Sequence, residues 1–381
     1  MRLRNLLYIT GFILPALLVA ACSGGSSTDD DINNAIHSSN TSDYDEGDTG
    51  TPVSGNSIAL TYYTYYGTKL PDPSYVTHVN YAFAELNVTN DVYQSFTVLG
   101  MSDHFMKLVE LKKSHPSLKV LLSFHNTAGG GFSSMVKTDS GRKKFAQDCL
   151  SFLQTYGIDG IDLDWEFPGM SWSSSITYDV VNDVPNFTLL LKQLRETFGS
   201  QYLLSYAGYC MDKQPTTGGY RYIDIAASLP YVDYINIMTY DLSVSGGNFH
   251  SALEGATSAA YTCKGAVAAY AKVGAPYSKL LLGIPFYGRK DWGSALTYKT
   301  IVNLDKSVYN IDNWSTAQSV PYVTRVSNGE VLWGYDNPRS IAIKGSWAMG
   351  LGMRGLFSWE CSQDDDNESL TKALYNAVMK K

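Results

Sequence analysis

The chain has 381 residues, of which 44% are hydrophobic and 17% are charged, so it can bury the core of one large domain or of two ordinary ones. Its formal net charge of −7 argues against a polyanionic partner, and the sequence has no basic patch with interleaved aromatic residues, so we expect no nucleic-acid binding. The 28 Tyr, 7 Trp and 14 Phe residues are explained first by core packing, although aromatic rings also suit the apolar faces of sugars.

Residues 1–21 have the pattern of an export signal. Arg2 and Arg4 precede an apolar run that Pro15 interrupts and that is short for a membrane span. The run ends in LVAAC, which resembles the bacterial lipobox, and this resemblance implies that Cys22 is lipidated and begins the mature chain. We therefore expect an exported protein that its lipid anchors to a bacterial membrane. The sequence does not determine which side of which membrane carries it, and the cell surface is one of the options. Cleavage of an ordinary secretory signal is the alternative.

The rest of the chain divides into a linker and a folded part. Residues 22–56 are rich in Ser, Asp, Asn, Thr and Gly and cannot bury enough surface to offset their chain entropy, which predicts a flexible linker. In residues 57–381, short apolar runs alternate with longer amphipathic ones. Eight runs are candidate strands, beginning at Ser57, Val76, Leu118, Gly157, Tyr202, Val232, Lys279 and Gly355. Helical patterns between and after them begin at Phe105, Gly141, Asn186 and Leu370.

This alternation predicts the fold. Strands that alternate with helices favour parallel βαβ units, and eight such units predict an α/β fold of the closed (β/α)8 TIM-barrel type. The segment from Arg289 to Met353 is long for one crossover, so we expect a small insertion between strands 7 and 8. An open doubly wound sheet is the competing fold, because periodicity does not separate the two; no GxGxxG follows the first candidate strand.

Acidic residues interrupt the fourth candidate strand, which lies in the sequence DGIDLDWEFPG. Because side chains on a strand alternate between faces, Asp162, Asp164 and Glu166 share one face. In a barrel that face points inward, and Glu166 lies nearest the carboxyl end, where barrel enzymes carry their catalytic residues. Carboxyl groups this close do not all ionise readily, so they share a proton and Glu166 can act as a general acid. A structural acid ladder or a cation site is the alternative, but we expect no metal and no cofactor.

At this point the sequence resembles a known family. Asp159, Asp162, Asp164 and Glu166 match the DxxDxDxE signature of glycoside hydrolase family 18, and DGIDLDWEFPG is similar to its chitinase branch. The resemblance covers residues 57–381. Its further motifs are Tyr62 and Tyr63 in the first strand, Asn80 to Phe83 in the second, Met238 to Asp241 in the sixth, Pro285 to Arg289 in the seventh and Trp359 in the eighth.

The resemblance implies retaining hydrolysis in which the acetamido group of the substrate replaces a second carboxylate. Glu166 would protonate the glycosidic oxygen, and Asp164 would orient the acetamido group. Tyr240 would hydrogen-bond the acetamido oxygen, while Asp162 would store the shared proton. The substrate-binding residues that the resemblance implies are Tyr62, Phe83, Ser123, Trp165, Met238, Asp241, Tyr287, Arg289 and Trp359.

The third strand departs from the pattern of the family. It ends in SFHN, Ser123 to Asn126, where the family has SxGG, so a histidine and an asparagine stand in place of two glycines. This difference puts the local backbone path in doubt, because glycine permits close backbone approach. We interpret His125 as a loop residue or a sugar contact rather than a metal ligand.

We therefore expect a monomeric glycosidase that hydrolyses β-1,4 linkages next to N-acetylglucosamine, in chitin or chitooligosaccharides. An endo-β-N-acetylglucosaminidase acting on N-glycans would need the same acids and is the alternative among enzymes. A non-catalytic glycan-binding barrel is the alternative from another class, although such lectins often lose the acid that Glu166 supplies here.

Overall fold

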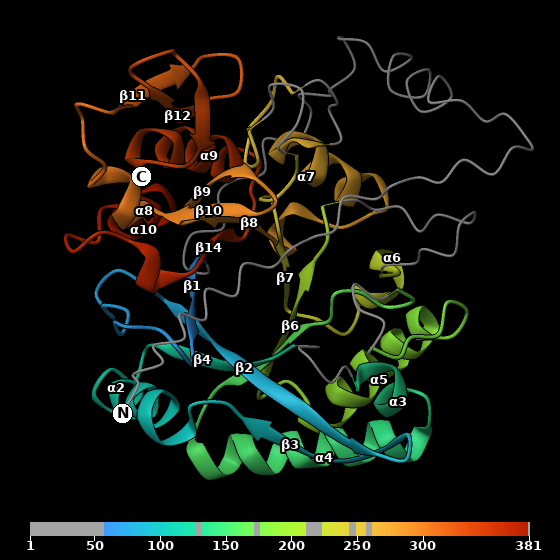
Figure 1. Ribbon diagram of the computed structural model, residues 1–381. Coiled ribbons are helices and arrows are strands. Elements are labelled where there is room, and N and C mark those ends of the chain that lie inside the picture. The colour runs from blue at the N-terminus through green and yellow to red at the C-terminus, as the bar shows by residue number, and fades with distance from the viewer. Residues whose placement is uncertain are drawn as a thin grey trace, which may run out of the picture.

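The computed structural model describes residues 57–125, 131–170, 176–210, 223–243, 249–256 and 261–379. The predicted signal, Cys22 and the linker lie outside these residues, as does Asn126. The described chain forms a closed parallel barrel surrounded by helices, with a second, smaller sheet beside it (Figure 1). The predicted (β/α)8 fold is therefore confirmed.

The eight predicted strands are the eight strands of the barrel. They are β1 (Ile58–Thr64), β2 (His78–Thr89), β4 (Lys119–His125), β5 (Gly160–Asp164), β6 (Leu203–Gly208), β7 (Tyr234–Ile237), β8 (Leu280–Pro285) and β14 (Gly355–Trp359). Each pairs in parallel with its neighbours, and β1 pairs with both β2 and β14, which closes the sheet. The alternative of an open doubly wound sheet is therefore wrong. One further strand, β3 (Val92–Val98), pairs antiparallel with the end of β2.

Helices cover the outside of the barrel. They are α2 (Met106–Ser114), α3 (Phe132–Val136), α4 (Asp139–Tyr156), α5 (Asp183–Phe198), α6 (Ile225–Ser228), α7 (Cys263–Lys272), α9 (Pro338–Gly350) and α10 (Ser369–Met379), with short turns η1 (Met101–Phe105), η3 (Tyr277–Lys279) and η4 (Cys361–Gln363). Helix α4 shows why they pack there. The Thr138 side chain caps its first turn, and its periodic apolar residues Phe145, Cys149 and Leu153 are fully buried.

The expected insertion between the seventh and eighth barrel strands is a five-stranded antiparallel sheet, coloured orange in Figure 1. Its strands are β9 (Tyr287–Asp291), β10 (Ser294–Thr297), β11 (Tyr309–Ser315), β12 (Val320–Arg325) and β13 (Val331–Gly334), with α8 (Tyr298–Val302) between β10 and β11. The sheet starts before the predicted segment because β9 follows β8 after a single residue. Helix α9 lies outside it and belongs to the barrel.

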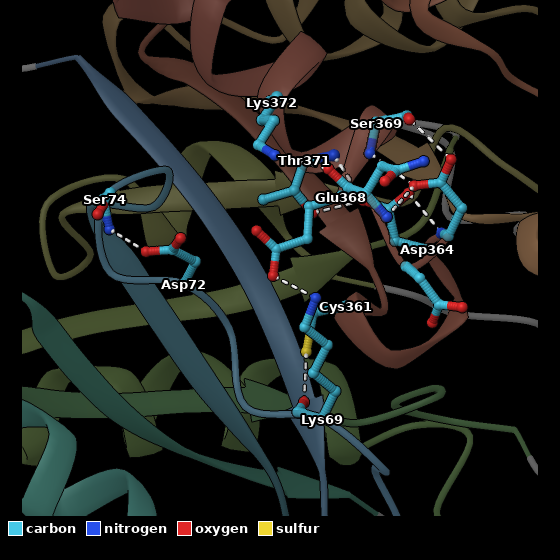
Figure 2. Close-up of polar contacts among 12 residues, drawn as sticks. Lys69, Asp72, Ser74, Cys361, Asp364, Glu368, Ser369, Thr371 and Lys372 are labelled. Carbon is cyan, nitrogen blue, oxygen red and sulfur yellow. Dashed lines mark hydrogen bonds and ion pairs between the residues drawn. The ribbon is translucent and has the colours of Figure 1, made fainter.

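The connection between β1 and β2, residues 65–77, contains no helix. The segment that follows β14 holds this connection in place (Figure 2). Lys69 forms an ion pair with Glu368 at 2.5 Å, and its backbone carbonyl accepts a weak hydrogen bond from the Cys361 thiol. Asp364 accepts backbone N–H groups of Leu370 and Thr371 and so fixes the start of α10. In the part of the chain that the structure describes, no helix is both long and apolar enough to cross a bilayer.

The core has two layers. One lies between the strands and the helices, and the other fills the barrel itself. The inner layer contains aromatic and aliphatic side chains from β1, β2, β4, β7, β8 and β14, and it ends at the carboxyl end of the strands with partly exposed rings. Because side chains alternate along each strand, any polar residue on the inward face must find its partner inside this layer.

Candidate active site

Three carboxyl groups follow β5 from the interior of the barrel to its mouth. Asp162 and Asp164 lie on the strand and are 0% and 5% exposed, whereas the Glu166 side chain, two residues beyond Asp164, is 24% exposed. The alternation of side chains therefore places the acids as predicted, with Glu166 the most accessible. A partly exposed acid above buried ones is suited to exchange a proton with a bound molecule.

Asp162 lies within a cage of hydrogen-bond donors. Its carboxylate accepts hydrogen bonds from the hydroxyl of Tyr62 at 2.8 Å, from Ser123 at 2.7 Å and from Ser205 at 2.6 Å, and from the Asn236 amide at 3.2 Å. The register explains this arrangement, because Ser123 and Ser205 stand beside Asp162 on the two flanking strands. Burial raises the pKa of Asp162, although the four donors oppose that shift. The cage fixes the base of the site.

Asp164 is placed differently, because its Oδ1 atom is buried and has no hydrogen-bond partner. Burial raises the pKa of this carboxyl well above its usual value, and the nearby charges of Glu166 and Asp162 raise it further. The group is therefore readily protonated, and its Oδ1 atom is an acceptor that no described group uses. Both properties fit the proton sharing that the sequence predicted.

Aromatic side chains line the mouth above the acids. Trp359 packs against Phe83 with ring centroids 5.7 Å apart and 20° between planes, and it lies 5.4 Å from the Tyr62 ring. Tyr240 and Met238 belong to the same inner cluster. Burial raises the pKa of Tyr240 well above 10, so its hydroxyl keeps its proton and can donate a hydrogen bond. Flat rings with a few polar groups suit the recognition of a sugar ring.

A buried ion pair borders this mouth. Arg289 binds Asp241 through two nitrogens, at 2.5 Å and 2.8 Å, and its guanidinium lies 5.5 Å from the centre of the Tyr287 ring. Burial would raise the pKa of Asp241, but hydrogen bonds from His250 and Arg289 and their charges lower it to about 2. Asp241 is therefore a fixed anion. The Tyr287 ring beside the pair lies next to that of Tyr240, with ring centroids 6.3 Å apart.

The prediction that Trp165 contacts substrate is wrong. Trp165 is 2% exposed and lies in the outer core layer, where it stacks on Phe132 at 5.1 Å and meets the edge of Phe187 at 5.8 Å. The reason is the alternation along β5, which turns Trp165 toward the helices. The first acid of the motif, Asp159, is also outside the site. It binds Lys112 and Lys119 and accepts the Val120 N–H, so it anchors the start of the strand.

Sequence reasoning missed three residues of this site. Ser205 and Asn236 are polar residues within apolar strands, and that interruption was a signal that they face an interior partner. His250 binds Asp241 at 3.1 Å and is fully buried, but it arrives from outside the regular strands and carried no sequence signal.

Among the residues that the structure describes, one group could hold a metal ion. His125, Asp164 and Glu166 each bring one ligand atom within 4.8 Å of the other two.

Strand β4 remains regular as far as His125, which pairs with Asp164. The backbone path that the sequence left in doubt is therefore that of a regular strand up to this residue.

A general acid above buried carboxyl groups, in the aromatic mouth of a (β/α)8 barrel, defines a glycosidase site. The chain belongs to the glycosyl hydrolases family 18, whose family model matches residues 58–364. It is 32% identical over 340 residues to chitotriosidase-1 of Mus musculus, an alignment that covers 77% of this chain and 68% of that protein.

Solved structures agree with this assignment. Chitinase ChiW of Paenibacillus sp. str. FPU-7, a multi-modular enzyme, is 27% identical with a TM-score of 0.74, over 85% of this chain and 43% of that one. A family 18 N-acetylglucosaminidase of Paenibacillus barengoltzii is 25% identical with a TM-score of 0.71, over 85% of this chain and 100% of that one.

Proposed function

We propose that this enzyme hydrolyses β-1,4 linkages next to N-acetylglucosamine in chitin or chitooligosaccharides, acting as a monomer. The observation that carries the proposal is the Asp162–Asp164–Glu166 series, in which only the last acid is exposed and the middle one has an unpaired buried oxygen. Two relatives support the substrate class, one named chitotriosidase-1, from Mus musculus, and one named chitinase C, from Streptomyces lividans.

Each group has a role in the proposed mechanism. Glu166 donates its proton to the glycosidic oxygen, and the acetamido oxygen of the substrate attacks the anomeric carbon to give an oxazolinium ion with retention. The unpaired Oδ1 of Asp164 accepts the acetamido N–H and stabilises the positive charge that develops. The protonated hydroxyl of Tyr240 donates to the acetamido oxygen and aligns it. Water then opens the ring with Glu166 as general base.

The caged Asp162 completes the scheme. Its four donors stabilise a negative charge at the base of the site, so Asp164 can keep a proton while it turns toward Glu166 and release it toward Asp162 afterwards. Phe83 and Trp359 provide the apolar surface beneath the distorted sugar.

Replacing the acid tests the catalytic assignment. Glu166→Gln should lower kcat on chitotetraose by about 10²–10⁴-fold, the usual contribution of a positioned general acid, while the oligosaccharide still binds. Glu254 is an exposed carboxylate that is distant from Glu166 in the sequence. Glu254→Gln is therefore the matched control and should keep wild-type turnover. Near-normal turnover by the Glu166→Gln protein would refute the assignment.

The products test the substrate. Chitotetraose should be cleaved, whereas a fully deacetylated oligosaccharide should not, because it lacks the group that attacks. A thiazoline mimic of the oxazolinium ion should inhibit strongly. If the enzyme released glycans from a high-mannose glycoprotein and left chitotetraose intact, the substrate would instead be N-glycans. A protein that bound both sugars and cleaved neither would be a glycan-binding barrel.

We further propose that Cys22 carries a lipid that anchors the exported enzyme to a bacterial membrane, with residues 22–56 as a tether. The support is the LVAAC sequence after a basic and apolar segment. Intact mass of the membrane fraction should show a diacylglyceryl-modified chain beginning at Cys22, and Cys22→Ala should release the protein. A Cys22→Ala protein that stayed equally membrane-bound would contradict the anchor.

A further inference from the structure

His125 stands where the family pattern has a glycine, and the fold turns it into the active site. It is the last residue of β4 and pairs with Asp164 on β5, just as Ser123 pairs with Asp162. Because side chains alternate along a strand, His125 shares the inward face of Ser123. It is 4% exposed, and its Nε2 atom lies 3.4 Å from Oε1 of Glu166.

The imidazole ring is held in this place by packing. Its centroid is 4.9 Å from that of the Phe83 ring, with 33° between the planes, and Phe83 in turn stacks on Trp359. The three rings form one continuous layer from β4 through β2 to β14. A ring fixed on one side by Phe83 presents its nitrogen to Glu166 without a further loss of rotamer freedom.

We propose that His125 is a positioning residue for the general acid. Its Nε2–H donates a hydrogen bond to the carboxyl group of Glu166 and holds that group in the direction of the glycosidic oxygen. The inference rests on the proposed function. Glu166 lies beyond the end of β5 and is the most exposed of the three acids, so the strand itself does not fix the direction of its long side chain. Separations between catalytic groups are often long without substrate and shorten when it binds. A glycine at this position offers no such anchor.

Substrates with different leaving groups distinguish this role from a purely structural one. Cleavage of chitotetraose needs a proton on the departing sugar oxygen, whereas dinitrophenolate leaves without one. The test compares kcat/KM, which reports the bond-breaking step, on chitotetraose and on dinitrophenyl di-N-acetylchitobioside. Three variants are compared. His125→Gly restores the glycine, His125→Phe keeps the ring on Phe83 without a donor, and His125→Gln keeps a side-chain N–H donor.

We expect the Gly and Phe variants to lose about tenfold or more on chitotetraose, the worth of a hydrogen bond to the carboxylate that forms as Glu166 gives up its proton. On the dinitrophenyl substrate the loss should be less than about threefold. The Gln variant should stay within about threefold of wild type on both. The ratio of the two activities within one sample does not depend on how much of a variant is folded. Glu166→Gln provides the reference, since its loss should be confined to chitotetraose in the same way.

Equal losses on the two substrates, or a Phe variant with the wild-type ratio, would overturn the inference and assign His125 to packing alone. A Gln variant that lost as much as the Gly variant would overturn it too. These results are distinct from a failure of the proposed function, in which the wild-type enzyme would cleave neither substrate.

Discussion

Glu360 gives a prediction about stability whose size follows from the structure. It comes directly after Trp359 at the end of β14 and is 2% exposed, and its carboxyl group accepts the Ser362 N–H at 3.1 Å. Burial raises the pKa of Glu360 from 4.5 to about 7, against the opposing effect of Ser362. The folded protein therefore binds this proton more tightly than the unfolded chain does.

The sign of the effect follows from that difference. The stability that this proton contributes is fully present below pH 4.5 and is lost as the pH rises through about 7. One pKa unit corresponds to about 1.4 kcal/mol. Between pH 5 and pH 8, Glu360 should therefore lower the free energy of unfolding by about 2.5 kcal/mol.

The change to make is Glu360→Gln, which keeps the shape and the acceptor for Ser362 but cannot ionise. Urea unfolding at pH 5, 6, 7 and 8 should show that the wild-type protein loses about 2.5 kcal/mol more across this range than the variant. Glu110→Gln is the control. Its carboxylate is 67% exposed, so that variant should follow the wild-type pH dependence. If wild type and Glu360→Gln lost stability in parallel, the reasoning from burial would be refuted.

Three further predictions concern Asp162, Trp165 and Asp241. Asp162→Ala leaves several buried donors without an acceptor and should lower the free energy of unfolding by about 3 kcal/mol in urea; an unchanged midpoint would contradict the cage. Trp165→Leu should lower the free energy of unfolding by about 2 kcal/mol, while KM for chitotetraose stays within about twofold, because the ring packs on the helices. A large rise in KM would show that Trp165 contacts substrate after all. Asp241→Asn removes the partner of buried Arg289 and should cost about 3 kcal/mol near neutral pH. Because the pKa of Asp241 is lowered to about 2, this loss should shrink as the pH falls from 3.8 toward 2, and a pH-independent difference would count against an ionic role.

The barrel could be predicted from the sequence because its signal is local. Each strand is a short apolar run bounded by polar residues, and the eight runs recur with helices between most of them. The hairpin strand β3 was missed, since most of its side chains are exposed and it lacks the apolar run of a buried strand. A signal was present in Asn90 and Asp91, which form the two-residue turn with φ of 51° and 60°, a conformation that these residues adopt more readily than most.

The acids of the site could likewise be predicted, because alternation along one strand determines which side chains face inward. The same rule placed Trp165 outside, and its assignment to the substrate followed the motif instead of the geometry. The partners of Asp162 could not be predicted in full. Whether Ser205 and Asn236 reach it depends on the stagger of β6 beside β5 and of β7 beside β6, which only the closed sheet fixes. His250 depends on a contact between separate loops, which has no periodic signature.

The pairing of β1 with β14 has a consequence for how the chain folds as it is synthesised. On one side of β1, residues 58–61 find their partners in residues 355–358, nearly three hundred positions later, so the cylinder cannot be completed until the last part of the polypeptide has emerged. Until then both β1 and β8 present open edges, which can recruit other chains. A truncation before β14 should therefore yield aggregates instead of a smaller enzyme.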